Sequence, residues 1–409
     1  MAKQNKPAIR FKGFTDAWEQ RKLSEMCGTF EYGLNAAAKE FDGKNKYIRI
    51  TDIDDASREF LLSDLSSPDI CLDGMSKYLL SSGDIVFART GASVGKTYIY
   101  RENDGIVYFA GFLIRAKVNQ DNDAEFVFQS TLSPSYEKYI RITSQRSGQP
   151  GVNAQEYGEY DLFAPSKEEQ QRIGHFLRGI DSLITLHQRK YEKLQVLKKA
   201  MLEKMFPKNG SSVPEIRFKG FTDAWEQRKV GELIEDYIEK TTVQNQYPVL
   251  TSSQQQGVVF QEDYFADRQV TTNDNIGYYV LPYGYFTYRS RSDTDVFVFN
   301  RNNIIDKGII SYYYPVFLPK DCDSNFLLRR LNHGIKKQLS MAAEGTGQKV
   351  LAHNKFKNMI VDVPEIEEQQ KIGLYFESLD HLITLHQRKL QKLQECKKAF
   401  LEKMFVSQP

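Results

Sequence analysis

The sequence has no long apolar run and no strong excess of charge. Its 409 residues include 55 Lys and Arg against 53 Asp and Glu, which gives a formal net charge of +2. No stretch approaches the ~18 consecutive apolar residues of a membrane helix, and the start MAKQNKPAIRFKGF lacks the apolar core of a signal peptide. We therefore expect a cytoplasmic chain with no membrane partner, and the charge alone points to no nucleic-acid partner.

Cysteine and histidine are scarce and scattered. The four cysteines form no CxxC pair: Cys27, Cys71, Cys322 and Cys396. This spacing favours reduced thiols over disulfides or a zinc site. The six histidines form no HExxH motif, and no ligand set stands at zinc-like spacing. His187 and His386 occupy equivalent positions of two similar segments, so we interpret them as packing residues and expect no metal site.

Motifs of several enzyme classes are also missing. GASVGKT places three residues between Gly91 and Gly95, where a phosphate-binding loop needs four, and TYIYR after it is typical of a strand. No Pro-Pro pair occurs, so the Asn/Asp-Pro-Pro-aromatic signature of amino-methyltransferases is absent, and no GxGxxG follows a strand. We therefore expect no catalytic residue and no cofactor site in this chain.

The sequence does contain an internal duplication. IRFKGFTDAWEQRK occurs at residues 9–22 and again at 216–229. Residues 168–206 match residues 367–405 at 26 of 39 positions. The stretches between these repeats, residues 23–167 and 230–366, hardly resemble each other, and we call them the first and second variable segments. The chain is therefore two copies of one module, in which the repeated parts are scaffold.

Each closing repeat predicts a long helix. Apolar residues recur near the 3.5-residue period of a coiled coil over residues 173–205 and 372–404. Pro165 and Pro364 stand just ahead of acidic residues that suit a helix start. β-rich runs such as DIVFA and YFTY, broken by Gly, Asn and Asp, fill the variable segments. We expect a mixed α/β (α+β) fold, with two globular domains separated by two long antiparallel coiled-coil helices and related by a pseudo-twofold axis.

The expected boundaries follow from the repeats. They are a first globular domain at 1–166, a central helix at 167–206, a linker at 207–214, a second globular domain at 215–365 and a C-terminal helix at 366–406. Trp18 and Trp225, the two tryptophans of the chain, both lie in the opening repeat. Burial of a large apolar area is their commonest use, so we hypothesise that each attaches its globular domain to the end of the helical pair.

The order of these motifs resembles the specificity subunit of type I restriction-modification systems. The likeness rests on FxGFxxxWEQRK, a variable segment with an ARTGASVGK turn, a late Gly-Gln pair, and P-x-x-EEQQ-x-I before a long helix. It covers residues 9–406, and the duplicated order carries it. One departure is that the second variable segment has YRSRSDTD where the first has ARTGASVGK.

The resemblance implies a function that the composition does not. Each globular domain would be a target-recognition domain for one half of a split double-stranded DNA sequence. The helices would set the gap and bind two methyltransferase subunits, and separate motor-nuclease subunits would cut DNA. The chain itself would be non-catalytic and hold no cofactor, while S-adenosylmethionine, ATP and Mg would belong to the partner subunits.

Residue types that read DNA gather in polar, glycine-bearing stretches of both variable segments. The candidates in the first segment are Arg89, Thr90, Ser93, Lys96, Gln145, Arg146, Ser147 and Gln149. Those in the second are Ser252, Ser253, Gln254, Gln255, Tyr288, Arg289, Ser290, Arg291, Thr346, Gln348 and Lys349. Gln149 and Gln348 are shared by both modules, so we expect a common task such as backbone contact or loop closure. The acidic stretch from Asp52 to Asp73 is expected to face away from DNA, because phosphates repel it.

Two other functions stay open on the sequence alone. An enzyme that modifies or cuts DNA by itself would show methyl transfer or nicking by the pure chain. A coiled-coil assembly protein without a DNA role would show no salt-dependent DNA binding with its partner present. The small net charge fits DNA recognition only if the partners supply much of the backbone contact, so the isolated chain is expected to bind weakly.

Overall fold

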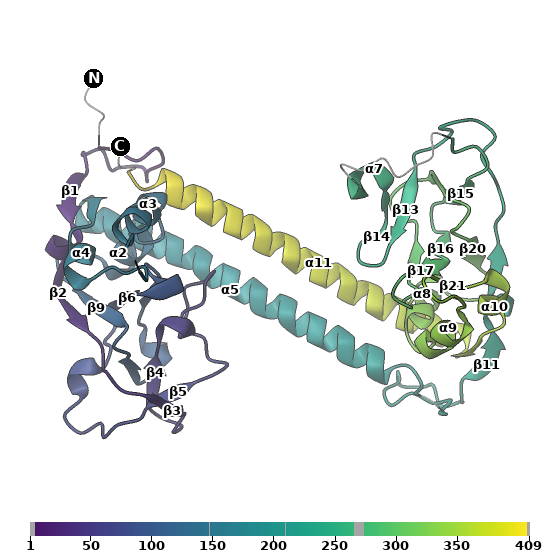
Figure 1. Cartoon of the computed structure of the whole chain (residues 1–409), viewed down its shortest axis with the longest axis horizontal. Coiled ribbons are helices and arrows are strands. Elements are labelled where there is room, and N and C mark those ends of the chain that lie inside the picture. Colours follow the sequence, from purple (N-terminus) through teal and green to yellow (C-terminus); the bar gives the residue numbers. More distant parts are fainter. Residues whose placement is uncertain (1–4, 147, 209, 266–273, 407–409) are drawn as a thin grey trace. The chain divides into compact units, whose positions relative to one another are not determined.

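The structure is a computed structural model that describes residues 5–146, 148–208, 210–265 and 274–406. The chain divides into two compact units, one of residues 1–190 with 386–409 and the other of residues 191–385. Each unit contains one whole variable segment and parts of both long helices. Figure 1 shows the chain and labels many of its helices and strands, which are numbered in chain order. None of the helices in the described parts of the chain combines the length and the apolar composition of a membrane span.

The first unit is built on a four-stranded antiparallel sheet in the order β2-β9-β6-β7. Its strand β6 reads IVFA and is buried along its whole length, as the apolar run predicts. The strands are β1 (Glu19–Lys22), β2 (Cys27–Tyr32), β3 (Ala38–Glu40), β4 (Lys46–Ile48), β5 (Ser66–Pro68), β6 (Ile85–Ala88), β7 (Thr97–Ile99), β8 (Val107–Phe109), β9 (Leu113–Val118) and β10 (Asp161–Ala164). The short helices are α1 (Leu23–Met26), α2 (Ala124–Ser130), α3 (Pro134–Thr143) and α4 (Ala154–Gly158), with 3₁₀ turns at Ile50–Asp52, Ser76–Tyr78, Gly91–Ser93 and Glu102–Asp104.

The second unit repeats this sheet order with unrelated residues. Its four-stranded antiparallel sheet runs β12-β20-β16-β18, so the strand after the opening repeat again pairs with the last strand of the sheet in sequence. The strands are β11 (Glu226–Lys229), β12 (Ile234–Asp236), β13 (Leu250–Ser253), β14 (Gly257–Phe260), β15 (Tyr279–Pro282), β16 (Phe286–Tyr288), β17 (Arg291–Ser292), β18 (Phe299–Arg301), β19 (Lys307–Ile310), β20 (Val316–Pro319), β21 (Lys349–Val350) and β22 (Ile360–Val363). The short helices are α6 (Val230–Leu233), α7 (Gln261–Tyr264), α8 (Ser324–Asn332), α9 (Lys336–Ala342) and α10 (His353–Lys357).

The two predicted long helices are present and pack antiparallel within each unit. They are α5 (Lys167–Lys204) and α11 (Ile366–Lys403), each of 38 residues. In the first unit the carboxylate of Asp181 on α5 lies 2.5 Å from the ammonium of Lys397 on α11. In the second unit the roles are exchanged, and Lys198 on α5 lies 2.5 Å from Asp380 on α11. The expectation of antiparallel helices with internal twofold equivalence is therefore confirmed at the level of these pairs.

The repeated residues build the same junction in both units. In the first unit Arg10, from the opening repeat, donates two hydrogen bonds of 2.6 and 2.7 Å to the carboxylate of Glu169, which is fully buried at the start of α5. In the second unit Arg217 donates two hydrogen bonds of 2.7 Å to the buried carboxylate of Glu368 at the start of α11. Each opening repeat is thus fastened to a long helix by a bidentate ion pair.

The start of α5 also holds a neighbouring short helix. The side-chain oxygen of Gln170 accepts a 3.0 Å hydrogen bond from the backbone N–H of Asp123, whose carboxylate in turn caps α2 by accepting from the N–H of Phe126 at 2.8 Å. Gly174 makes room for this cap, because a Cβ there would lie 2.6 Å from the carboxylate oxygen of Asp123. The same arrangement recurs in the second unit with Gln369, Asp323 and Gly373. These contacts account for the second Glu and the first Gln of EEQQ, and for the glycine that follows, in both copies.

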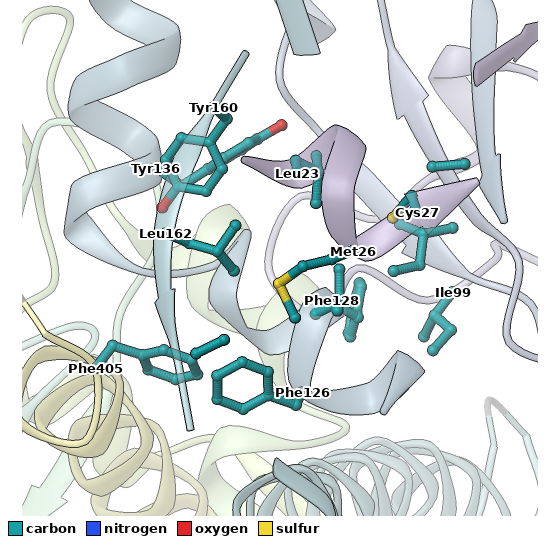
Figure 2. Packing of buried hydrophobic residues seen from close by; sticks show 14 of the residues in the cluster. Leu23, Met26, Cys27, Ile99, Phe126, Phe128, Tyr136, Tyr160, Leu162 and Phe405 are labelled. Atoms are coloured by element: carbon teal, nitrogen blue, oxygen red, sulfur yellow. The ribbon is translucent and has the colours of Figure 1, made fainter. Parts of the chain in front are cut away.

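Both tryptophans are packing residues, as expected. Trp18 is 2% exposed and Trp225 is 3% exposed. In the first unit the ring of Trp18 meets Phe126 of α2 and Phe405 just beyond α11, at centroid distances of 5.8 and 6.4 Å. Figure 2 shows Phe126 and Phe405 side by side in this core. In the second unit Trp225 meets Phe206, just beyond α5, at 6.0 Å. Each opening repeat therefore packs on the end of one long helix.

Candidate nucleic-acid interface

The structure brings the two candidate stretches of the first variable segment together. Just beyond β6, the carbonyl of Arg89 accepts a 2.9 Å hydrogen bond from the N–H of Val152. The N–H of Gly91 donates to the carbonyl of Pro150 at 3.0 Å. The side-chain nitrogen of Gln149 lies close to Gly91, since a Cβ on that glycine would approach it to 3.0 Å. The ARTGASVGK turn and the loop ahead of α4 thus form one surface.

The buried Tyr157 fixes the backbone of this turn by hydrogen bonds from the interior. The hydroxyl of Tyr157 donates to the carbonyl of Ala88 at 2.6 Å and accepts from the N–H of Gly95 at 3.1 Å. Burial raises the pKa of Tyr157 well above its ordinary value, so the hydroxyl stays protonated and can make both bonds. Gly95 has a φ of +83°, and a Cβ there would lie 2.5 Å from Ile140. The glycine is therefore required both for backbone conformation and for close packing.

The candidates on this surface differ in their solvent exposure and in the contacts that they already make. Gln145, Arg146 and Gln149 are exposed, whereas Arg89, Thr90, Ser93 and Lys96 are half-buried. Arg146 is paired with Glu156 and donates to the carbonyl of Thr143 at 2.7 Å. Ser147 lies outside the described residues.

Lys96, a candidate DNA contact, lies beside the acidic stretch. Its ammonium forms an ion pair with Asp55, a member of the acidic stretch. That stretch was expected to face away from DNA, and Lys96 was expected to contact it. The pair places Asp55, one member of the acidic stretch, beside the turn. DNA contact by Lys96 stays a prediction.

The second variable segment has the same pairing without the glycine-rich turn. Just beyond β16, the carbonyl of Ser290 accepts a 2.8 Å hydrogen bond from the N–H of Leu351. Strand β17 then pairs with β21, with Arg291 opposite Val350. The side-chain amide of Gln348 donates to Asp293 at 2.9 Å, which ties the late Gly-Gln pair to the loop after β17. The departure from ARTGASVGK therefore changes the surface residues and leaves the backbone arrangement in place.

Three candidates of the second segment are interior residues, which corrects their assignment as DNA contacts. Tyr288 is fully buried in β16 and its hydroxyl lies 3.3 Å from the ring nitrogen Nδ1 of His353. Ser252 and Ser253 are buried in β13. The hydroxyl of Ser252 accepts from Asn300 at 2.8 Å, and that of Ser253 accepts from two N–H groups of the following turn. Their polar groups serve the fold because neighbouring strands cover them.

The other candidates of this segment remain at the surface. Gln254 and Gln255 are exposed at the tip of the β13-β14 hairpin, and Arg289 and Thr346 are exposed as well. Ser290, Arg291, Gln348 and Lys349 are half-buried. The hydroxyl of Ser290 donates to the carbonyl of Tyr313 at 2.7 Å, so this group is already engaged.

Exposed aromatic side chains that we did not predict as DNA contacts lie beside the candidates. Phe112 is 57% exposed and Tyr32 is 44% exposed, and both rings lie near the guanidinium of Arg89. In the second unit the exposed Tyr312 lies against Tyr313, which faces Arg291. The run SYYYP carried a signal, because three consecutive tyrosines ahead of a proline cannot all point into one core.

The histidine pair lies within the first unit, between the long helices. The Nδ1 atoms of His187 and His386 are 2.8 Å apart, which supports the packing interpretation. Burial is the largest cause that holds the pKa of both histidines below the ordinary value. The neighbouring His386 adds to this effect at His187, and the positive charges of Lys190 and Lys389 add to it at both. In the described parts of the chain, no three His, Cys, Asp or Glu side chains are grouped so that they could hold a metal ion.

Known proteins share this organisation. The protein named "Putative type I restriction enzyme MjaX specificity subunit", from Methanocaldococcus jannaschii, is 21% identical over 402 aligned residues, and the match covers 94% of this chain and 92% of that protein. The type I restriction enzyme MjaVIII specificity subunit of the same organism is 23% identical over 374 residues, covering 84% and 83%. Among solved structures, the type I restriction-modification system S subunit from M. genitalium has a TM-score of 0.63 at 13% identity, covering 99% of this chain and 100% of that one. At that identity the likeness concerns the fold alone.

The family described as "Type I restriction modification DNA specificity domain" matches the chain twice, at residues 15–196 and 222–395. The two matches coincide with the two copies of the module, and together they span most of the sequence. The chain therefore belongs to the family of type I restriction-modification DNA specificity subunits.

Proposed function

We propose that the chain recognises an asymmetric DNA sequence made of two unlike halves, with one half read by each variable segment. The contrast between scaffold and surface carries this proposal. The pair Arg10–Glu169 recurs as Arg217–Glu368, and both units share one sheet order. The loop after β6 nevertheless reads ARTGASVGK and the loop after β16 reads YRSRSDTD. Two domains with the same scaffold and different surface residues are suited to binding two different DNA half-sites.

We further propose that the long helices recruit two methyltransferase subunits, which bring in the motor-nuclease subunits. Support comes from exposed leucines that are identical in both copies of LITLHQRK. Leu183 and Leu382 are 46% and 40% exposed, and Leu186 and Leu385 are 45% and 36% exposed. Exposed apolar side chains at matching positions are typical of a binding surface that occurs twice. Two equivalent surfaces fit two copies of one partner.

We assign methyl transfer and DNA cleavage to the partner subunits. Specificity subunits of this family are non-catalytic, and catalysis lies in other subunits of the type I system. We place S-adenosylmethionine, ATP and Mg in those partner subunits and the assembly in the cytoplasm. The target-recognition domains are proposed at residues 1–166 and 215–365.

DNA contact is proposed for the candidates that stay at the surface. In the first segment these are Arg89, Thr90, Ser93, Gln145, Arg146 and Gln149. In the second they are Gln254, Gln255, Arg289, Arg291, Thr346, Gln348 and Lys349. Most protein–DNA hydrogen bonds go to phosphate and sugar, so most of these side chains are expected to position the duplex and few to read bases.

A map of methylated adenines tests the proposal. The chain is expressed with its cognate methyltransferase subunit in a host that lacks DNA methylation, and the methylated sites are read across the genome. Two short, unlike halves with a fixed gap are expected. A matched chain with the two variable segments exchanged should methylate a site whose halves are exchanged. An uninterrupted motif, or no motif although the complex assembles, would reject the proposal.

A further inference from the structure

Two half-buried arginines of the candidate surface, Arg89 and Arg291, hold guanidinium groups for which the described residues supply no hydrogen-bond acceptor and no ion-pair partner. Other half-buried or buried arginines, such as Arg101 and Arg330, are paired with carboxylates. The buried side-chain polar atoms that lack a partner in the described parts of the chain include none from Arg89 or Arg291. Their guanidinium donors therefore remain accessible to water, and a ligand with acceptor atoms can take the place of that water.

Aromatic rings hold both groups in place. The guanidinium carbon of Arg89 lies 5.1 Å from the ring centre of Tyr32 and 6.0 Å from that of Phe112. The guanidinium carbon of Arg291 lies 4.0 Å from the ring centre of Tyr313. Contact with a ring attracts the cation and limits its orientations. Each planar group is therefore positioned before any ligand arrives.

The two units present these groups from the same backbone arrangement. The N–H of Arg89 donates to the carbonyl of Phe112 at 3.0 Å. At the equivalent place in the second unit, the N–H of Ser290 donates to the carbonyl of Tyr313 at 3.1 Å. The loop that carries the ring thus pairs with the strand end that carries the arginine in both units. Arg291 stands one residue further along than Arg89 does, which suits readers of unlike halves.

We propose that Arg89 and Arg291 each read one guanine, through its O6 and N7 atoms in the major groove. This inference rests on the proposed function and names the residues that carry it out. Arginine with two parallel donors is the commonest reader of guanine. A fixed plane serves a base edge, whereas a phosphate can be met by a flexible cation. Tyr32, Phe112 and Tyr313 are positioning residues, and each half-site contains a G·C pair.

The methylation map tests the assignment with Arg89→Lys and Arg291→Lys, which keep the charge and lose the planar fork. Arg89→Lys is expected to relax one G·C position of one half by about ten- to a hundredfold, leaving the other half unchanged. Arg291→Lys is expected to do the same in the opposite half. Arg101→Lys is the matched control, because Arg101 lies in the same variable segment, is paired with Glu125 and is not among the proposed DNA contacts, so its motif should stay unchanged.

A single-atom change in the DNA separates base reading from phosphate contact. The complex of the chain with its methyltransferase subunit is given duplexes carrying guanine or 7-deazaguanine at the relaxed position. The wild-type complex should bind the 7-deaza duplex about tenfold more weakly, whereas the Arg89→Lys complex should hardly distinguish the two. Phe112→Ala should lower the same sensitivity, and Phe112→Tyr should restore it.

The outcomes distinguish this inference from the proposed function. If the wild-type chain directs methylation to no two-part motif, both the proposed function and this inference are rejected. A two-part motif that both lysine variants leave intact would reject the inference alone. Equal 7-deazaguanine sensitivity in the wild-type and Arg89→Lys complexes would also reject it, because N7 would then be read by another residue.

Discussion

Replacing Glu169 by glutamine is expected to destabilise the first unit by about 3 kcal/mol. The side chain of Glu169 is 1% exposed and accepts two short hydrogen bonds from Arg10, whose side chain is 14% exposed. Removing one partner of a buried ion pair costs about 3–5 kcal/mol, because the other charge stays desolvated. Arg10 retains some contact with water, so the lower end of that range is expected. Glutamine keeps the shape, removes the charge and replaces one of the two acceptor oxygens by an NH2 donor.

The neighbouring Glu168 provides a matched control. Its side chain is 71% exposed and lies 3.7 Å from Arg172 one helical turn away, so the change Glu168→Gln should cost no more than about 0.5 kcal/mol. At about 2–4 °C per kcal/mol for a unit of about 150–250 residues, the expected falls in Tm are about 6–12 °C for Glu169→Gln and about 2 °C or less for Glu168→Gln.

Tryptophan fluorescence can follow the first unit alone. In a Trp225→Phe background, Trp18 is the remaining tryptophan and reports the core that the Arg10–Glu169 pair closes. Adding Arg10→Met to Glu169→Gln should cost less than the sum of the single changes, because the stranded charge is gone. If Glu169→Gln and Glu168→Gln lower the Tm equally, the ion pair does not stabilise the junction and our reasoning fails.

Three further predictions concern the scaffold and the variable segments. Gly174→Ala should destabilise the first unit by about 1–3 kcal/mol, because the added Cβ would meet the carboxylate of Asp123 that caps α2. Gly179→Ala is the control: the space around Gly179 is open, so this change should stabilise α5 by about 0.4–1 kcal/mol. Urea unfolding measures both free energies. The folded His187–His386 pair has lowered pKa values, so the unfolded chain binds more protons and the free energy of unfolding should fall as the pH drops below about 6.5; replacing both by phenylalanine should flatten this dependence, and an unchanged pH profile would contradict it. Giving both modules the first variable segment should yield a site with two identical halves in the methylation map, and a retained unlike half would contradict the assignment.

Several local features could be predicted from the sequence. The long helices follow from a 3.5-residue period that neighbouring residues alone define. Burial of Trp18 and Trp225 follows from their size and their aromatic surroundings. Arg89 and Tyr288 were both chosen by residue type. Arg89 lies at the surface, where DNA contact stays a prediction, whereas Tyr288 is buried. Its polar hydroxyl suggested a surface position, but strand β16 lies inside a sheet whose neighbours come from distant parts of the chain.

The sequence by itself determined the duplication, the two long helices and the division into repeated scaffold and variable surface, because each is encoded in identities or periods along the chain. Only the tertiary structure decided that two unlike variable segments share one sheet order. It also decided that Arg10 meets Glu169, and that Arg89 and Arg291 lie beside aromatic rings. These contacts join residues far apart in sequence. Strand pairing across such distances depends on loop closure and on burial of the whole sheet, which no short stretch of residues encodes.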